Sequence, residues 1–229
     1  MRELFDSETI SIILLTLRMT LTSTAISALL GIPAGLLLAR TRPAFWIFRF
    51  IKRFVVGLNR TLMATPPVVA GLVVWVLFRR GGPFGDLGLV LTFEGMVLAQ
   101  TLLITPIICG IVYTAADRYS ERIQSFAHTM GATRLQAHIL TIKELSNEIY
   151  FSVATGFGRA MSEVGAIMLV GGNIRGLTRT MNTSIVMMHR QGEFEQALLF
   201  GAILMIIAFT VQMLADFLHI RERRVDENF

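Results

Sequence analysis

The stretch GMVLAQTLLITPIICGIVYTAA, residues 95–116, is 22 residues long and carries no formal charge. A helix of that length rises about 33 Å at 1.5 Å per residue, enough to cross a hydrocarbon core of about 30 Å. Four further runs have a similar character: Ile10–Ala39, Thr61–Phe78, Ile149–Ile174 and Gln196–Ala215. We therefore predict an all-α integral membrane protein with five transmembrane helices in a single domain, residues 1–229.

Composition supports this class. Apolar residues make up 53% of the chain and charged residues 16%, whereas about 25% of residues are charged in soluble domains. Only three charged residues, Arg18, Arg159 and Glu163, fall inside the predicted spans. These figures exclude an ordinary soluble domain and a disordered chain. The single cysteine, Cys109, excludes an intramolecular disulfide framework.

The basic residues predict the orientation in the membrane. Thirteen Lys and Arg residues fall after spans one, three and five, against six on the alternate side. Because basic residues collect in cytoplasmic loops, we place the N-terminus outside and the C-terminus in the cytoplasm. The net charge of +5 is thus attributed to orientation and not to nucleic-acid binding. The first run is expected to be a retained helix, since acidic Glu3, Asp6 and Glu8 replace the basic leader of a signal peptide.

Pro66 and Pro67 predict a break within the second run. Proline inside a helix removes a hydrogen bond and bends the axis. Such breaks are tolerated in a membrane where neighbouring helices or a cavity satisfy the freed backbone groups. A simple packing kink is the alternative interpretation.

Catalytic motifs are absent from the sequence. Neither Lys52 nor Lys143 follows a glycine, so the chain has no P-loop. It also has no HExxH motif and no G-x-S-x-G elbow, and its four histidines are scattered. We therefore predict a chain that is not an enzyme, with no catalytic residue, no metal site and no cofactor of its own.

The cytoplasmic segment 117–148 is longer than a turn requires. Its apolar residues recur at helical spacing on both sides of Gly131: Ile123, Phe126, Ala127 and Met130 before it, and Leu135, Ile139 and Ile142 after it. This pattern predicts two short amphipathic helices joined at Gly131-Ala132-Thr133. They would either lie on the lipid headgroups or dock a soluble partner.

The residues Ala127-His-Thr-Met-Gly131, with helices on both sides, resemble the coupling loop of ABC importer permeases. A longer match lies downstream, in Gly158-Arg-Ala-Met-Ser-Glu-Val-Gly-Ala166 and Gly171-Gly-Asn-Ile-Arg-Gly176. This sequence resembles type I permeases of the molybdate, sulfate and tungstate branch, the tungstate type in particular. With Pro66–Gly71 and Gly82–Gly85, the resemblance covers most of residues 60–210.

The resemblance implies a type I ABC importer transmembrane domain with a cytoplasmic coupling-helix loop. The chain would be the permease subunit of an ATP-driven importer for a tetrahedral oxyanion, most simply tungstate. It implies a homodimer in the prokaryotic plasma membrane, two cytoplasmic ATPase subunits that bind ATP and Mg, and one extracytoplasmic anion-binding protein. The residues implied for ATPase coupling are Ile123, Phe126, Ala127, Met130, Gly131, Ala132 and Leu135. Those implied for the pathway and gate are Arg159, Ser162, Glu163, Gly165, Gly171, Gly172 and Asn173.

Two alternatives remain open at this stage. A molybdate or sulfate permease of the same branch fits the same motifs. A gradient-driven anion carrier would instead need internal repeats and titratable groups at mid-membrane, and five spans do not divide into two equal halves. The four-residue spacing of Arg159 and Glu163 also permits two roles for Arg159, as the partner of Glu163 or as an anion ligand.

Overall fold

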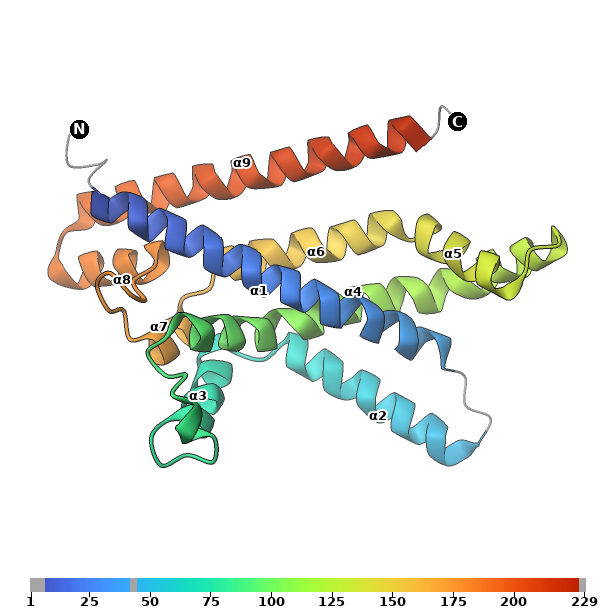
Figure 1. Cartoon of the computed structure of the whole chain (residues 1–229), viewed down its shortest axis with the longest axis horizontal. Helices are drawn as coiled ribbons and strands as arrows, with labels where there is room; N and C mark the ends of the chain where they lie inside the picture. The colour runs from blue at the N-terminus through green and yellow to red at the C-terminus, as the bar shows by residue number, and fades with distance from the viewer. Residues whose placement is uncertain (1–6, 42–44, 227–229) are drawn as a thin grey trace. The chain divides into compact units, whose positions relative to one another are not determined.

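The computed structural model describes residues 7–41 and 45–226, with side chains as far as Phe217. All regular elements in that part of the chain are helical, which confirms the all-α prediction (Figure 1). The elements are α1 (Ser7–Arg40), α2 (Trp46–Met63), α3 (Pro67–Phe78), the 3₁₀ turn η2 (Gly85–Leu87), α4 (Phe93–Thr129), α5 (Arg134–Glu144), α6 (Ser146–Met161), α7 (Gly165–Gly171), α8 (Met181–Gln191) and α9 (Phe194–Asp226).

Three helices are long and apolar enough to cross a membrane: α1, α4 and the part of α9 from Phe194 to Phe217. Two broken pairs also qualify when each pair counts as one span, namely α2 with α3 and α6 with α7. The candidate spans then reach the predicted five. The second run breaks at Ala64–Pro66, and Pro67 is the first residue of α3, a position where proline is tolerated because its missing N–H would have no partner.

The chain forms two compact units. Unit 1 comprises residues through Thr22, Pro67–Gln100 and the chain from Gly158 onward. Unit 2 comprises Ser23–Pro66 and Thr101–Phe157. The gate motif that follows Gly158 therefore belongs to unit 1, and the coupling segment belongs to unit 2.

In unit 1, α3 and α7 pack with their backbones almost in contact. A Cβ atom added at Gly71 would lie 2.6 Å from the Cα of Ala166, and one added at Gly165 would lie 2.8 Å from a methyl of Val68. Helices in a membrane gain little from burying apolar surface against each other, so small residues that allow close van der Waals contact stabilise the pair. Gly71 of the first motif and Gly165 of the second thus serve one interface.

We expect Gly71→Ala to force α3 away from α7. Overpacking of this kind costs about 2 kcal/mol, equivalent to a fall in apparent Tm of roughly 4–8 °C for a chain of this size. Thermal unfolding of the purified protein measures the effect. The matched control is Gly201→Ala in α9, where no atom lies within 4 Å of the added Cβ. Equal stability of the two variants would contradict the close α3–α7 contact.

The rest of unit 1 is held by two apolar clusters and a buried polar contact. One cluster contains Met19, Met96, Val97 and Ile167, and the other is built on Ile12, Met181 and Phe200. The hydroxyl of Thr16 accepts a hydrogen bond from the backbone N–H of Met181 at 2.9 Å. This contact joins the first turn of α8 to α1.

In unit 2, α4 packs against α1, α2 and α6. A Cβ added at Gly35 of α1 would lie 2.7 Å from the carbonyl oxygen of Cys109. One added at Gly156 of α6 would lie 2.8 Å from a methyl of Ile104. The side chain of Asn59 in α2 donates a hydrogen bond to the carbonyl of Pro106 at 3.1 Å. α4 is therefore the common partner of the other helices in this unit.

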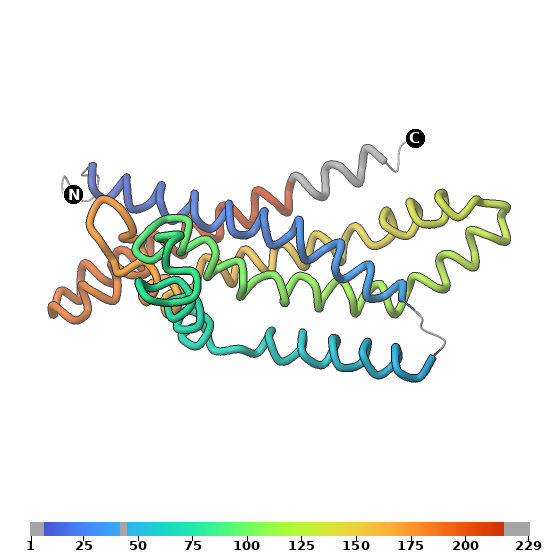
Figure 2. Tube along the Cα trace, turned by 60° about the horizontal axis from the view of Figure 1, so that its bottom comes forward, coloured from blue at the N-terminus to red at the C-terminus, as the bar shows by residue number. Residues whose placement is uncertain are grey.

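The coupling segment differs from its prediction in one respect. The expected first short helix is instead the end of α4, which runs without interruption to Thr129. No strong helix breaker stands between Pro106 and Gly131, so the span simply continues into the cytoplasmic segment. At Gly131 the backbone takes φ +82°, and the chain turns back through α5 and α6 (Figure 2). A capping box between Thr133 and Gln136 then begins α5.

Candidate functional site

The fourth predicted span is broken at Ser162–Val164, between the end of α6 and the start of α7. The carboxylate of Glu163 lies over the new helix start, where it accepts a hydrogen bond from the N–H of Ala166 at 3.1 Å. Its side chain is only 2% exposed. A carboxylate at a helix N-terminus satisfies an unpaired N–H and complements the helix dipole. This break lies within a run that is predicted to be one continuous span, Ile149–Ile174.

Two buried amide side chains satisfy the carbonyl groups at the break. Asn182, in the first turn of α8, donates to the carbonyl oxygens of Met161 and Glu163, each at 2.8 Å. Gln100 of α4 donates to the carbonyl of Ala160 at 2.7 Å. Unpaired backbone groups at membrane depth cost several kcal/mol each. These amides therefore make the interruption of the span tolerable.

Arg159 lies one turn before Glu163 and faces it. The guanidinium Nη2 and the carboxylate Oε2 are 3.8 Å apart, so the pair inferred from the four-residue spacing is present. The two partners differ in environment, because the Arg159 side chain is 37% exposed. Ser162 is exposed, and its hydroxyl donates to the carbonyl of Arg159 at 3.1 Å. Arg159 therefore neutralises a buried carboxylate while keeping access to the surface.

The second group of gate residues closes α7. Gly172 caps the helix with φ +69°, and Asn173 follows with φ +55°. Glycine and asparagine are the residues that most readily adopt this left-handed conformation. The hydroxyl of Thr178 donates to the carbonyl of Gly171 and accepts from the N–H of Ile174. Gly172 and Asn173 are thus suited to the turn itself, whereas a Cβ added at Gly171 would collide with the side chain of Met96.

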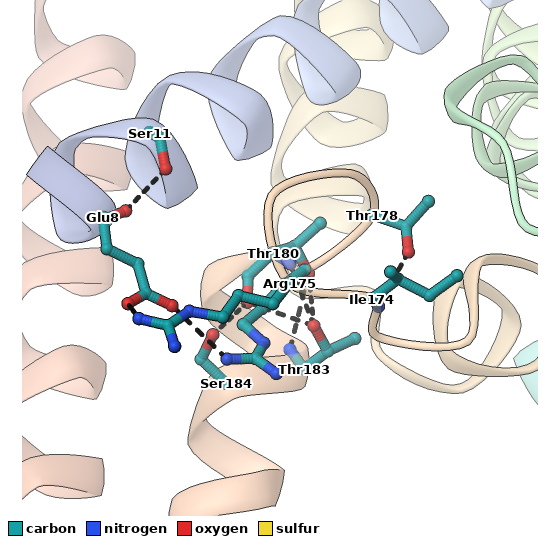
Figure 3. A network of polar contacts seen from close by, with 9 residues as sticks. Glu8, Ser11, Ile174, Arg175, Thr178, Thr180, Thr183 and Ser184 are labelled. Carbon is teal, nitrogen blue, oxygen red and sulfur yellow. Dashed lines mark hydrogen bonds and ion pairs between the residues drawn. The ribbon is translucent and has the colours of Figure 1, made fainter.

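An ion-pair network joins this turn to the start of α1 (Figure 3). The carboxylate of Glu8 bonds the guanidinium of Arg175 and lies 3.4 Å from that of Arg179. A capping box between Thr180 and Thr183 then begins α8. The turn after α7 is therefore tied to α1 on one side and to α8 on the other.

The residues of this site that sequence reasoning missed include Gln100, Asn182 and Glu8. A glutamine inside a 22-residue uncharged run was a signal, because buried polar side chains need hydrogen-bond partners. The sequence could not indicate which backbone group is that partner. Glu8 had been noted only as an acidic residue before the first span.

The predicted coupling residues lie together at the end of α4 and the start of α5. Phe126, Met130 and Leu135 are largely exposed, and Ile123 and Ala132 are half-buried. Ala127 is buried, so it supports the segment and does not offer a contact surface. The exposed apolar side chains are suited to fill a groove on another protein.

The site holds no arrangement typical of catalysis. Within the residues that the structure describes, no three His, Cys, Asp or Glu side chains are placed to hold a metal ion. A broken helix whose backbone groups are satisfied by side chains is instead a point where a span can bend. Residues 31–224 match the family described as "Binding-protein-dependent transport system inner membrane component".

The chain belongs to this family. The permease is 39% identical over 207 residues to a tungstate uptake system permease protein of Peptoclostridium acidaminophilum, covering 90% of this chain and 88% of the relative. It is 32% identical over 212 residues to a probable anion ABC transporter permease protein of Haloferax volcanii, covering the same shares.

A solved structure shares the fold. The crystal structure of an amino acid ABC transporter with histidines matches 93% of the permease and 92% of its own chain, with a TM-score of 0.63 and 14% sequence identity. The permease is thus a multi-pass transport component of the inner membrane and not an enzyme. Family membership implies, in general terms, an ATPase and a substrate-binding protein as partners.

Proposed function

We propose that the permease is the membrane subunit of an ATP-driven importer for a tetrahedral oxyanion, with tungstate as its substrate. The observation that carries this proposal is the 39% identity to a tungstate uptake permease along 90% of the chain. The anion transporter permease of Haloferax volcanii supports the same class of substrate. Molybdate and sulfate, which are also tetrahedral dianions, are the competing substrates.

In this proposal two copies of the permease form the path across the membrane. Each copy docks one cytoplasmic ATPase, which binds ATP and Mg, through the exposed side chains of Phe126, Met130 and Leu135. One extracytoplasmic binding protein delivers the anion. Closure of the ATPases is transmitted through the coupling segment, and the path opens and closes near the broken α6–α7 span.

ATP hydrolysis by the reconstituted complex tests the substrate. The permease is co-expressed with its ATPase, placed in proteoliposomes and supplied with its binding protein loaded with tungstate, molybdate or sulfate. We expect tungstate to stimulate hydrolysis and uptake at the lowest concentration, because the dry site of a binding protein distinguishes anions by size and hydrogen bonding. If sulfate or molybdate stimulates ATP hydrolysis more strongly, that anion and not tungstate is the substrate. Anion uptake without ATP would contradict the importer itself.

The proposed orientation has its own test in intact cells. Single cysteines at Ser7, Asp86 and Gln191, in a Cys109→Ser background, should react with an impermeant thiol reagent. A cysteine at Ser125 should not, because the coupling segment is expected in the cytoplasm. All four positions are exposed in the permease, so burial within the chain does not explain a lack of reaction. The reverse labelling pattern would overturn both the orientation and the docking assignment.

A further inference from the structure

A basic cavity lies between α2 and α4 in unit 2. Its volume is about 500 Å³. Six of its lining residues are ionisable: Arg49, Lys52, Arg53 and Arg60 from α2, and Tyr113 and Asp117 from α4. Four cations therefore face one carboxylate, and the formal charge of the cavity is +3.

The single carboxylate is already engaged by the lysine. Lys52 Nζ lies 3.7 Å from Asp117, donates to the carbonyl of Thr41 at 2.9 Å and sits 5.6 Å from the centre of the Tyr113 ring. None of the three arginines has an ion pair with a described residue of the chain. The charges of the three arginines are thus not paired with a carboxylate of the described residues.

The positions of the arginines on α2 direct them toward the cavity. Arg49, Arg53 and Arg60 are four and seven residues apart, so they share one stripe of the helix. Four of the exposed apolar side chains of α2 form a separate stripe on the opposite face: Ile47, Ile51, Phe54 and Leu58. Asn59, which bonds to α4, lies beside the basic stripe and fixes that side of α2 against α4.

Unpaired arginines on adjacent turns repel one another and carry an energetic cost. A doubly charged anion would remove the repulsion, and it would find donors on several sides. From these contacts we infer that the α2–α4 cavity is an oxyanion-binding vestibule at the cytoplasmic end of the permease, an inference that rests on the proposed function.

The size of the cavity sets the mode of binding. At about 30 Å³ per water molecule, 500 Å³ accommodates an oxyanion together with much of its hydration shell. Such a site distinguishes charge rather than ionic radius, so tungstate and sulfate bind to it alike. A cleft lined by one sign of charge raises the local concentration of the opposite ion. The vestibule thus concentrates the released anion beside the arginines of α2.

A phosphate group on a lipid offers the same chemistry as a free oxyanion. The arginine stripe adjoins α4 and shares its cavity with Tyr113 and Asp117, whereas the apolar stripe of α2 is the one available to acyl chains. The placement of the charge therefore favours a free anion over a lipid headgroup.

Equilibrium dialysis of sodium tungstate against the permease–ATPase complex tests the vestibule. The complex is held in nanodiscs of phosphatidylcholine, without the binding protein and at low salt. We expect tungstate and sulfate to compete for weak binding, and Arg49→Gln with Arg53→Gln to weaken it by about tenfold, the low end of the effect of a charged cleft. The matched control removes two charges elsewhere, by Arg79→Gln with Arg80→Gln, and should leave binding unchanged.

Two outcomes would overturn the vestibule. If the cavity variant, the control and the unchanged complex bind tungstate equally, the arginines do not form an anion site. The second outcome uses discs that contain phosphatidylglycerol. If tungstate no longer binds there, and the lipid is retained only when the arginines are present, the cavity binds lipid headgroups. Binding-protein-dependent ATP hydrolysis is measured on the same preparation. If the unchanged complex shows no such hydrolysis, the proposed function is contradicted. If hydrolysis is normal but tungstate does not bind, only the vestibule is contradicted.

Discussion

Arg159→Gln should destabilise the permease markedly, because it leaves the buried carboxylate of Glu163 without its cation. Breaking a buried pair by removing one partner costs about 3 kcal/mol at the lower end of the measured range, which suits a cation that is partly exposed. For a chain of this size that cost corresponds to a fall in apparent Tm of roughly 6–12 °C. Thermal unfolding of the assembled complex measures it.

The difference in burial predicts unequal effects of the two single variants. Glu163→Gln retains an oxygen that can accept from Ala166, and it leaves a cation that can reach water. We expect it to lose less than half as much stability as Arg159→Gln. The double variant, Arg159→Gln with Glu163→Gln, should recover most of the loss, because neither charge is then stranded.

Transport measurements separate this structural role from a role in the anion path. If Arg159 only neutralises Glu163, transport by each variant follows the amount of stable complex. A fully assembled Arg159→Gln complex with unchanged Tm and no transport would show that Arg159 acts on the anion. In that case the double variant would remain inactive.

Gly131→Val should uncouple ATP hydrolysis from the anion. The backbone at Gly131 has φ +82°, a conformation that costs a β-branched residue about 1–2 kcal/mol. That cost lowers the equilibrium constant for forming the turn between α4 and α5 by roughly five- to thirty-fold. We expect a similar loss of anion-stimulated ATP hydrolysis in the reconstituted complex, with the basal rate of the ATPase alone unchanged.

The control for this turn is Gly131→Asn, since asparagine adopts positive φ more readily than other residues with a side chain. It should retain most of the coupling. Phe126→Asp tests the neighbouring exposed surface without altering the turn. If Gly131→Val and Phe126→Asp both leave coupling intact, the segment lies on the lipid headgroups and does not dock the ATPase.

The pairing of Arg159 with Glu163 could be predicted from their spacing, although Glu163 lies just beyond the end of α6 at Met161 and not on the helix itself. A separation of four residues places two side chains on one face wherever the helix sits in the fold. The course of the coupling segment was predicted only in part. The turn at Gly131 follows from its glycine, but the continuation of α4 to Thr129 depends on the absence of any stop signal after the span.

The sequence by itself determined the class of the protein and its division into apolar spans. The length of an uncharged run is compared directly with the thickness of a bilayer, so no knowledge of neighbouring helices is needed. The asymmetry of basic residues between the two sides likewise predicts the orientation without knowledge of neighbouring helices. The close glycine contacts of α3 with α7 were not predictable, because a small residue shows where a partner can approach but not which helix it is.

Only the tertiary structure decided how the fourth span is broken. Carbonyl groups beside the break accept hydrogen bonds from Gln100, which lies 60 residues before Ala160, and from Asn182, which lies 21 residues after Met161. Their pairing depends on the packing of α4 and α8 around the break, and no local pattern records it. A buried amide must find a partner, but hydrogen bonds act over about 3 Å in space and are independent of separation along the chain.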